Sequence, residues 1–265
     1  MQIIVCLKQV PNTNEVKFDP KTGSLIREGV ASIINPDDKN ALEEALSLRE
    51  QNGGKVTVIS MGPAQAEFAL REALAMGADE AILLSDRAFA GADTWATSFT
   101  LAQGIKKLGN FDLILCGRQA IDGDTAQVGP GIAEHLDLPQ VTYLRKIISI
   151  DDTKAVVERA MEDGYQVVEV SLPAVLTAVK ELNTPRYPST YGIVDAFELK
   201  QVTVWGLEQL GVSADLVGLQ ASPTKVKKTF SPPGKGEIKF LEGTIKESVL
   251  GLITELQGKN VLQRG

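Results

Sequence analysis

The chain has 265 residues, and its 34 Asp and Glu outnumber its 27 Lys and Arg, which gives a formal net charge of −7. An acidic chain without a run of basic residues is a poor candidate for binding nucleic acid. No apolar run approaches the roughly 20 residues of a membrane span, and the N-terminal residues have the pattern of a strand rather than of a signal peptide. The composition therefore predicts a soluble, cytoplasmic protein with one large domain, or one domain and a tail.

Two cysteines and one histidine offer little for metal or nucleophile chemistry. Cys6 and Cys116 form no CxxC motif and lie in apolar runs, where cysteine acts as a small hydrophobic residue. His135 lies in a helical pattern without a nearby nucleophile motif, and a single histidine excludes a His-rich metal site. We therefore expect no metal site and no catalytic side chain, which suits chemistry carried out by a cofactor.

Strands and helices alternate over the first half of the chain. Helical patterns separate four apolar runs of strand length, at residues 2–7, 56–60, 81–84 and 112–116. Asn35 or Asp37 is a candidate cap for the first helix, and Asp93 is a candidate cap for the third. Such alternation predicts a parallel sheet covered on both faces, with ligands beyond the carboxyl ends of its strands. Those ends carry residues 6–10, 61–63, 85–94 and 117–125.

The pattern changes after Pro139. An antiparallel meander added to the sheet is predicted by four β-rich segments, at residues 141–150, 155–161, 165–171 and 174–179. From about residue 184 the sequence is less regular, with two short helical patterns at residues 205–210 and 243–256. The expected fold is a doubly wound α/β domain, residues 1–190, with a mainly parallel sheet extended by the meander. Residues 191–265 are expected to form an irregular C-terminal arm that packs on a partner subunit.

The most informative stretch is residues 112–136, with the sequence DLILCGRQAIDGDTAQVGPGIAEHL. It predicts a buried strand, a polar loop and then a helix. A loop of this kind at a helix N-terminus presents free N–H groups and the positive end of the helix dipole, which suits a phosphate or pyrophosphate. The loop has neither the GxGxxG fingerprint nor a P-loop, so it belongs to neither of these motifs.

Several segments resemble the β subunit of an electron-transfer flavoprotein: MQIIVCLKQVP, INPDD, SMGPAQ, ALAMGADEAILLSDRAFAGADT and CGRQAIDGDTAQVGP. The resemblance runs in order along roughly the first 190 residues, and DGDTAQ is its most specific part. It implies a subunit that pairs with a larger α subunit. In ordinary members the β subunit holds a buried AMP. In a bifurcating subgroup an FAD takes that position, accepts hydride from NADH, and sends one electron toward the α-subunit FAD and the other toward ferredoxin.

Two segments are similar to the bifurcating subgroup and favour FAD over AMP, namely SDRAFAGADTWATS at residues 85–98 and SPTKVKKTF at residues 222–230. The implied function is hydride exchange with NAD(H) and delivery of single electrons, in a complex with the α subunit and a dehydrogenase. A structural AMP-binding subunit is the alternative. An ATP-using enzyme of related fold is a third and weaker interpretation, because the chain has neither a P-loop nor an SGGxDS-type loop.

The resemblance also implies which residues hold the nucleotide. We expect Asp122 and Asp124 to accept from ribose hydroxyls, and Thr125 and Gln127 to donate to phosphate. The two aspartates cannot both face a phosphate without a cation or Arg118 between them, so at least one should point away. The full expected site is Cys6, Asn35, Pro36, Asp37, Asp38, Met61, Arg118, Gln119, Ala120, Ile121, Asp122, Gly123, Asp124, Thr125, Ala126, Gln127, Val128 and Gly129.

Thr94 and Thr97 lie one helical turn apart and are expected to reach the flavin or diphosphate, unless this helix end is simply capped. Arg87 and Gly91 are candidates for contact with NADH, although Arg87 is equally well explained as a surface charge.

In ordinary members of the family, the loop at residues 183–192 carries an apolar anchor that docks on acyl-CoA dehydrogenases. Here the anchor position is Thr190, and Tyr187 or Tyr191 is a candidate for the anchor role. This departure leaves the identity of the dehydrogenase open, and the expected partner is a flavin-dependent dehydrogenase of the acyl-CoA or 2-hydroxy-acid type.

Overall fold

A nine-stranded sheet forms the centre of the chain. The computed structural model describes residues 1–12, 17–18, 25–26, 31–227 and 239–262. The strand order is β11-β10-β9-β12-β8-β1-β6-β7-β13. The strands are β1 (Gln2–Cys6), β6 (Lys55–Met61), β7 (Glu80–Leu84), β8 (Leu113–Gly117), β9 (Gln140–Ile150), β10 (Lys154–Met161), β11 (Gly164–Ser171), β12 (Ala174–Ala178) and β13 (Val202–Trp205).

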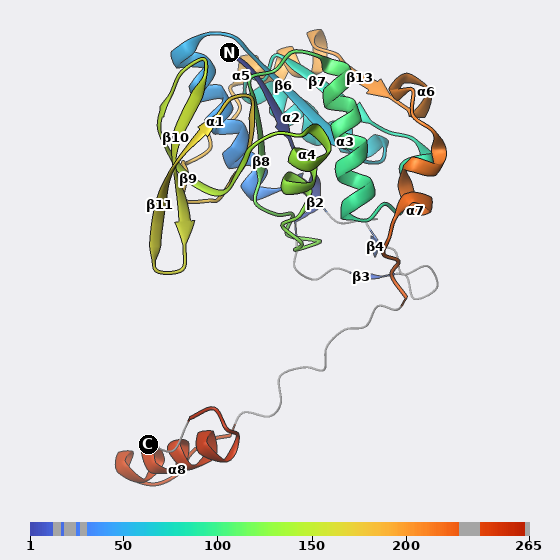
Figure 1. Ribbon diagram of the computed structural model, residues 1–265. Helices are drawn as coiled ribbons and strands as arrows, with labels where there is room; N and C mark the ends of the chain where they lie inside the picture. Colours follow the sequence, from blue (N-terminus) through green and yellow to red (C-terminus); the bar gives the residue numbers. More distant parts are fainter. Residues whose placement is uncertain (13–16, 19–24, 27–30, 228–238, 263–265) are drawn as a thin grey trace. The chain divides into compact units, whose positions relative to one another are not determined.

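Two helices cover each face of the sheet (Figure 1). Strand residues alternate between the faces, so Ile3 and Val5 of β1 pack in one core cluster, and Ile4 and Cys6 in the other. One face carries α1 (Pro36–Asn52) and α2 (Glu67–Met76), and the other carries α3 (Thr94–Leu108) and α4 (Val128–Leu136). The predicted doubly wound α/β fold is therefore confirmed.

The order of the strands reverses at β1. From β1 the chain proceeds to its neighbour β6 and then to β7, after which α3 leads back to β8 on the other side of β1. The register pairs Cys6 of β1 with Ile59 of β6 and with Cys116 of β8, and all three strands are parallel. In open α/β sheets such a reversal leaves a crevice at the carboxyl ends of the two strands, where ligands bind.

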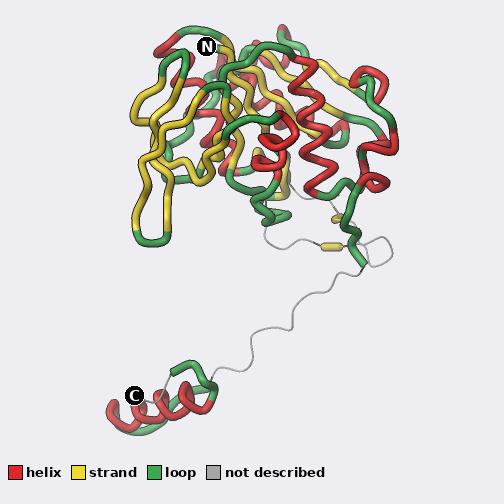
Figure 2. Tube along the Cα trace, in the orientation of Figure 1, coloured by secondary structure: helices red, strands yellow, loops and turns green. Residues whose placement is uncertain are grey.

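The meander extends the sheet at one edge, where Figure 2 shows its strands in yellow. β10 pairs antiparallel with β9 and with β11, as predicted. The last expected meander strand is different, because β12 lies between β9 and β8 and is parallel to both. All five residues of β12 are buried, which is typical of a central strand of a parallel sheet.

The first half of the expected arm belongs to the same compact unit as the sheet. Contacts divide the chain into residues 1–227 and 228–265. β13 pairs parallel with β7 and forms an edge strand, so this part of the chain contributes to the sheet itself. The unit also includes β2 (Gln9–Pro11), β3 (Lys17–Phe18), β4 (Leu25–Ile26), β5 (Ser32–Ile34), η1 (Ala64–Ala66), η2 (Arg87–Phe89), α5 (Thr190–Val194), η3 (Asp195–Leu199), α6 (Leu207–Leu210), η4 (Ala214–Leu216) and α7 (Gly218–Ala221).

The second unit contains one helix, α8 (Ile245–Gly258), in its described part. Thr244 and Glu247 form a reciprocal capping box at its start, and Lys239 pairs with Glu255. Phe240 and Ile245 are more than four-fifths exposed. Among the described residues, no helix combines the length and the apolar character that crossing a membrane requires.

Candidate functional site

The first turn of α1 forms hydrogen bonds to the ends of both β1 and β8, the strands at the reversal point. The Asp38 carboxylate accepts the N–H of Lys8, just beyond β1, at 2.7 Å, and the N–H of Gly117, the last residue of β8, at 3.0 Å. Gly117 has no room for a side chain, because a Cβ there would overlap Asp38. Burial raises the Asp38 pKa to about 7, while the hydrogen bonds from Lys8, Asn35 and Gly117 oppose the rise.

The two cysteines lie side by side at the same strand ends. Cys6 and Cys116 are register partners, and both are buried. Burial, together with the nearby Asp38 carboxylate, raises the pKa of both thiols well above its usual range. A thiol held neutral is a poor nucleophile. The buried position of both cysteines fits their expected structural role, and that Cys6 lines a nucleotide site stays a prediction.

Asn35 positions the polar loop after β8. The side chain is fully buried, its Nδ2 donates to the Gln119 carbonyl at 2.8 Å, and its Oδ1 accepts the Ile121 N–H at 3.0 Å. Pro36 follows it at the first position of α1, where proline is favoured. The Asn35 side chain accepts no N–H from its own helix, so the expected helix cap instead holds the loop.

The two loop aspartates have different partners. Asp122 is mostly buried and forms an ion pair of 2.6 Å with the Lys8 ammonium. Asp124 accepts a short hydrogen bond from the Gln119 amide. Arg118 instead lies 3.6 Å from Asp37 and stacks over the Tyr143 ring. The cation beside Asp122 is therefore Lys8, which the sequence pattern alone did not single out, although it lies just beyond the end of β1.

The loop leads into the N-terminus of α4 under backbone strain. Asp124 and Ala126 adopt positive φ angles of 51° and 54°, which are uncommon for residues with a Cβ and often mark ligand sites. Within the described part of the chain no side chain caps α4, so the N–H groups of its first turn, at Val128 and Gly129, are available to an anion.

Two glycines let α4 approach its neighbours closely. A Cβ on Gly129 would lie 2.6 Å from Thr177 Cγ2 and 2.9 Å from Cys116 Sγ, in the sheet beneath the helix. A Cβ on Gly131 would lie 2.5 Å from Ser98 Oγ, on the neighbouring helix α3. Gly131 was not among the expected site residues, although the spacing GPG could have indicated a close helix contact.

The N-terminus of α3 meets this loop. Asp93 caps α3 by accepting the Ala96 N–H at 3.1 Å, as predicted. The neighbouring Thr94 hydroxyl donates to the Gln127 side chain at 3.1 Å. Thr97 lies one turn further along α3, where its N–H bonds to the Asp93 carbonyl. Two helix N-termini, those of α3 and α4, therefore meet at the polar loop.

The segment before α3 is covered by residues 217–224. Gly91 has a φ of +72°, and a Cβ there would lie 3.1 Å from Leu219 Cβ, while the Leu219 N–H donates to the Ala90 carbonyl at 3.0 Å. Asp93 also accepts the N–H and hydroxyl of Thr224, at 2.9 and 2.8 Å. Gly91 is thus required by the local fold, whereas Arg87 is exposed. Residues 228–230 of the segment at 222–230 lie outside the described residues.

The remaining site candidates divide between two locations. Met61 ends β6 and packs against the same core cluster as Cys6 and Cys116. The expected partner-contact residues Tyr187, Thr190 and Tyr191 lie at and just before α5, which packs on α2. Tyr187 is 91% exposed and Tyr191 is 86% exposed.

Comparison with known proteins shows the family of the chain. Residues 22–204 match the family model described as the electron transfer flavoprotein domain. The electron transfer flavoprotein subunit beta of Thermoanaerobacterium thermosaccharolyticum is 60% identical, over 99% of this chain and 100% of that protein. The chain belongs to the electron transfer flavoprotein β-subunit family. As a β subunit of this family it acts in electron transfer.

Other relatives of this electron transfer flavoprotein β subunit are named as components of reductase systems. Subunit CarD of the caffeyl-CoA reductase-Etf complex of Acetobacterium woodii is 60% identical, over 99% of this chain and all of that protein. The acryloyl-CoA reductase electron transfer subunit gamma of Anaerotignum propionicum is 47% identical, over 99% of this chain and all of that protein.

Proposed function

We propose that this β subunit binds FAD at the reversal point of the sheet and exchanges hydride with NAD(H). It then passes one electron by way of the α-subunit FAD toward a dehydrogenase, and the other electron to ferredoxin. The observation that carries the choice of FAD is the contact between Thr94 and Gln127, which joins two helix N-termini at one loop. A diphosphate has two anionic groups, and each can be stabilised by one helix N-terminus.

The residues present fit the diphosphate and ribose of such a cofactor. The free N–H groups of Val128 and Gly129, together with Thr125 and Gln127, are donors suited to phosphate oxygens. Asn35 and Asp38 hold the loop that carries them, and the pair Lys8–Asp122 fixes the middle of that loop. The flavin itself would supply the redox chemistry, and the protein supplies binding, orientation and exclusion of water.

The proposed partners are an α subunit, ferredoxin and a flavin-dependent dehydrogenase of the acyl-CoA or 2-hydroxy-acid type. The names of the relatives from Acetobacterium woodii and Anaerotignum propionicum, both linked to acyl-CoA reductases, support the acyl-CoA type. Tyr187 and Tyr191 offer exposed aromatic side chains for docking. Arg87 is exposed in η2 and is suited to the diphosphate of NAD(H).

A structural AMP remains the second candidate, and one observation favours it. Leu219 packs on Gly91, so the space beside Gly91 that a nicotinamide would need is filled by a side chain of this subunit. A β subunit with AMP would still pass electrons through the α-subunit flavin, but it would not react with NADH.

The decisive experiment is analysis of nucleotides released from the denatured αβ complex, followed by anaerobic titration with NADH. The proposal predicts two FAD molecules per complex and bleaching of the flavin absorbance by NADH. One FAD and one AMP per complex, with no bleaching, would assign the chain to the AMP-binding members. Replacing Thr94 by Val should lower the FAD content, whereas the matched change Thr254→Val in α8 should not.

A further inference from the structure

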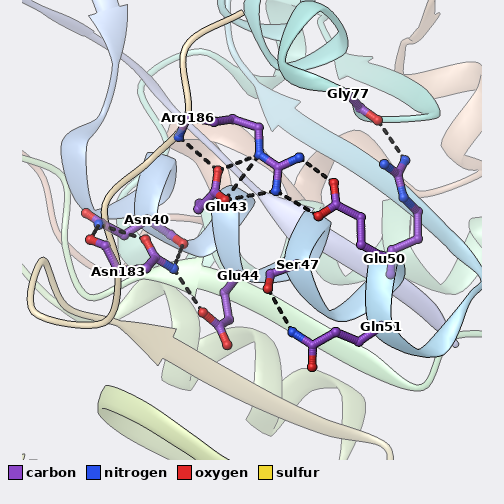
Figure 3. Close-up of polar contacts among 10 residues, drawn as sticks. Asn40, Glu43, Glu44, Ser47, Glu50, Gln51, Gly77, Asn183 and Arg186 are labelled. Carbon is purple, nitrogen blue, oxygen red and sulfur yellow. Dashed lines mark hydrogen bonds and ion pairs between the residues drawn. The ribbon is translucent and has the colours of Figure 1, made fainter.

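The segment that follows β12 is fastened along the outer face of α1 (Figure 3). Asn40 donates to the carbonyl and the side-chain oxygen of Asn183, at 2.8 and 3.1 Å. In return, Asn183 donates to the Asn40 carbonyl at 3.1 Å and to the Glu44 carboxylate at 2.9 Å. This reciprocal pair fixes both the backbone and the side chain of Asn183 at the start of the segment.

Arg186 forms the second and stronger attachment. Its guanidinium contacts both carboxylate oxygens of Glu43 at 2.9 to 3.1 Å, and the backbone N–H of Arg186 also donates to Glu43 at 2.9 Å. The remaining amino group of the guanidinium pairs with Glu50 (Figure 3). The guanidinium lowers the Glu50 pKa, and the two carboxylates raise the Arg186 pKa. A planar guanidinium that bridges two carboxylates is held in one orientation, which a lysine ammonium cannot reproduce.

The chain just beyond this attachment carries the most exposed aromatic side chains of the segment. Tyr187 follows Arg186 directly, and Tyr191 lies in α5. The backbone here is fixed on its far side as well, because Arg71 of α2 donates to the Ala196 carbonyl at 2.5 Å and stacks over Phe197. Exposed tyrosines on an ordered backbone are typical of binding hot spots, since little side-chain entropy is lost on docking.

The same helix holds the nucleotide loop at its other end. Asn35 and Asp38 secure that loop at the start of α1, and Glu50 lies near the end of α1. At a rise of about 1.5 Å per residue, roughly 22 Å of helix separates Asn35 from Glu50. A single rigid element therefore sets where the exposed tyrosines lie relative to the nucleotide site.

We propose that Arg186 is a positioning residue for partner docking. By bridging Glu43 and Glu50, it holds Tyr187 and Tyr191 as a preformed surface for a flavin-dependent dehydrogenase, and this inference rests on the docking role in the proposed function. Without the bridge, the segment would have to be ordered at each encounter, and that ordering opposes association. The bridge leaves the chemistry at the nucleotide site unchanged.

The test is steady-state electron transfer to the αβ complex that contains the full chain. The donor is whichever of two purified enzymes reduces the wild-type complex: an acyl-CoA dehydrogenase with butyryl-CoA, or a lactate-oxidising flavin dehydrogenase with D-lactate. Arg186→Ala should raise the KM for the complex about tenfold, which corresponds to about 1.4 kcal/mol. It should leave kcat and nucleotide content unchanged, and Arg186→Lys should have an intermediate KM.

Arg49→Ala is the matched control. Arg49 also lies on α1 and bonds to the Gly77 carbonyl at 2.7 Å and to Asp79 at 3.0 Å, away from the docking segment. This variant should lose stability to a similar degree without a change in KM. If Arg186→Ala does not fold, the KM values of Arg186→Lys and Glu50→Gln test the positioning role instead, because each of these variants retains the contact with Glu43.

Two further variants separate this inference from the proposed function. If Tyr187→Ala or Tyr191→Ala raises KM but the folded Arg186 variants do not, the positioning role is wrong and the docking surface stands. If neither tyrosine variant nor any Arg186 variant changes KM, the docking surface itself lies elsewhere, and both the inference and that part of the proposed function fail.

Discussion

At the scale of single residues, Asn35 makes a testable contribution to the nucleotide loop. Asn35→Ala removes both hydrogen bonds to the loop backbone and takes this partner from the partly buried Gln119 carbonyl and Ile121 N–H. The expected cost is about 1.5–3 kcal/mol, or roughly ten- to a hundredfold in nucleotide affinity. The loss of affinity is measured as the amount of nucleotide that the complex retains after extensive dialysis. Asn52→Ala, at the far end of α1, is the control and should retain the wild-type content.

Asp38 should give the fold a pH dependence. Its pKa is raised from 3.8 to about 7, so the folded chain holds a proton there that the unfolded chain releases. The contribution of this group to stability is therefore complete below about pH 4 and is lost as the pH rises through 7, by up to about 1.4 kcal/mol per pH unit. Urea unfolding at pH 5, 6 and 7 should show this slope in the wild type and not in Asp38→Asn.

The control for this slope is Asp151→Asn in the turn between β9 and β10. The hydrogen bonds from Thr153 and Lys154 lower the Asp151 pKa, so its contribution is lost only at pH values below its ordinary range. The variant should therefore keep the wild-type slope between pH 5 and 7. A slope that survives in Asp38→Asn would show that another group carries the titration.

At the scale of elements, the close contact of α4 with the sheet should tolerate no side chain at Gly129. Gly129→Ala would place a methyl within 2.9 Å of both Thr177 and Cys116, which should cost about 1–3 kcal/mol and move the N-terminus of α4. The urea concentration at the midpoint of unfolding and the amount of nucleotide retained should both decrease. Gly251→Ala in α8 meets only Leu241, at 3.7 Å, and should be neutral or stabilising by about 0.5–1 kcal/mol. Equal effects of the two changes would contradict this role of Gly129.

Most elements of the sheet and its covering helices could be predicted from local signals. Asp93 as a cap and Gly53 as a stop are recognisable in the sequence, because they act on their own helix. The place of β12 could not be predicted, because a short run of apolar residues has the same sequence pattern in an antiparallel meander and in a parallel sheet. Lys8 and Asn35 as holders of the loop depend on residues more than 80 positions away, so the topology had to be known first.

At the scale of the whole molecule, the second unit should serve assembly rather than nucleotide binding. We propose that the second unit, residues 228–265 of the expected arm at 191–265, packs on the α subunit, because the apolar side chains of α8, such as Ile245 and Leu250, are exposed in this unit. A chain that ends at Lys227 should keep its nucleotide but co-purify poorly with the α subunit in size-exclusion chromatography. Leu250→Asp should weaken assembly in the same direction, whereas Lys246→Ala should not. Wild-type assembly by the truncated chain would contradict the proposal.

The two strands that flank the proposed docking segment belong to the same sheet. β12 and β13 lie five places apart in the strand order, or about 24 Å at roughly 4.8 Å per strand. Together with the contacts of Asn183 and Arg186 on α1, these two fixed ends mean that the segment is ordered when the chain folds, and not when a partner arrives. An electron carrier must meet and leave its partner once in every turnover. With a segment anchored at both ends, the encounter rate should be set by diffusion and orientation, and departure need not wait for a loop to unfold.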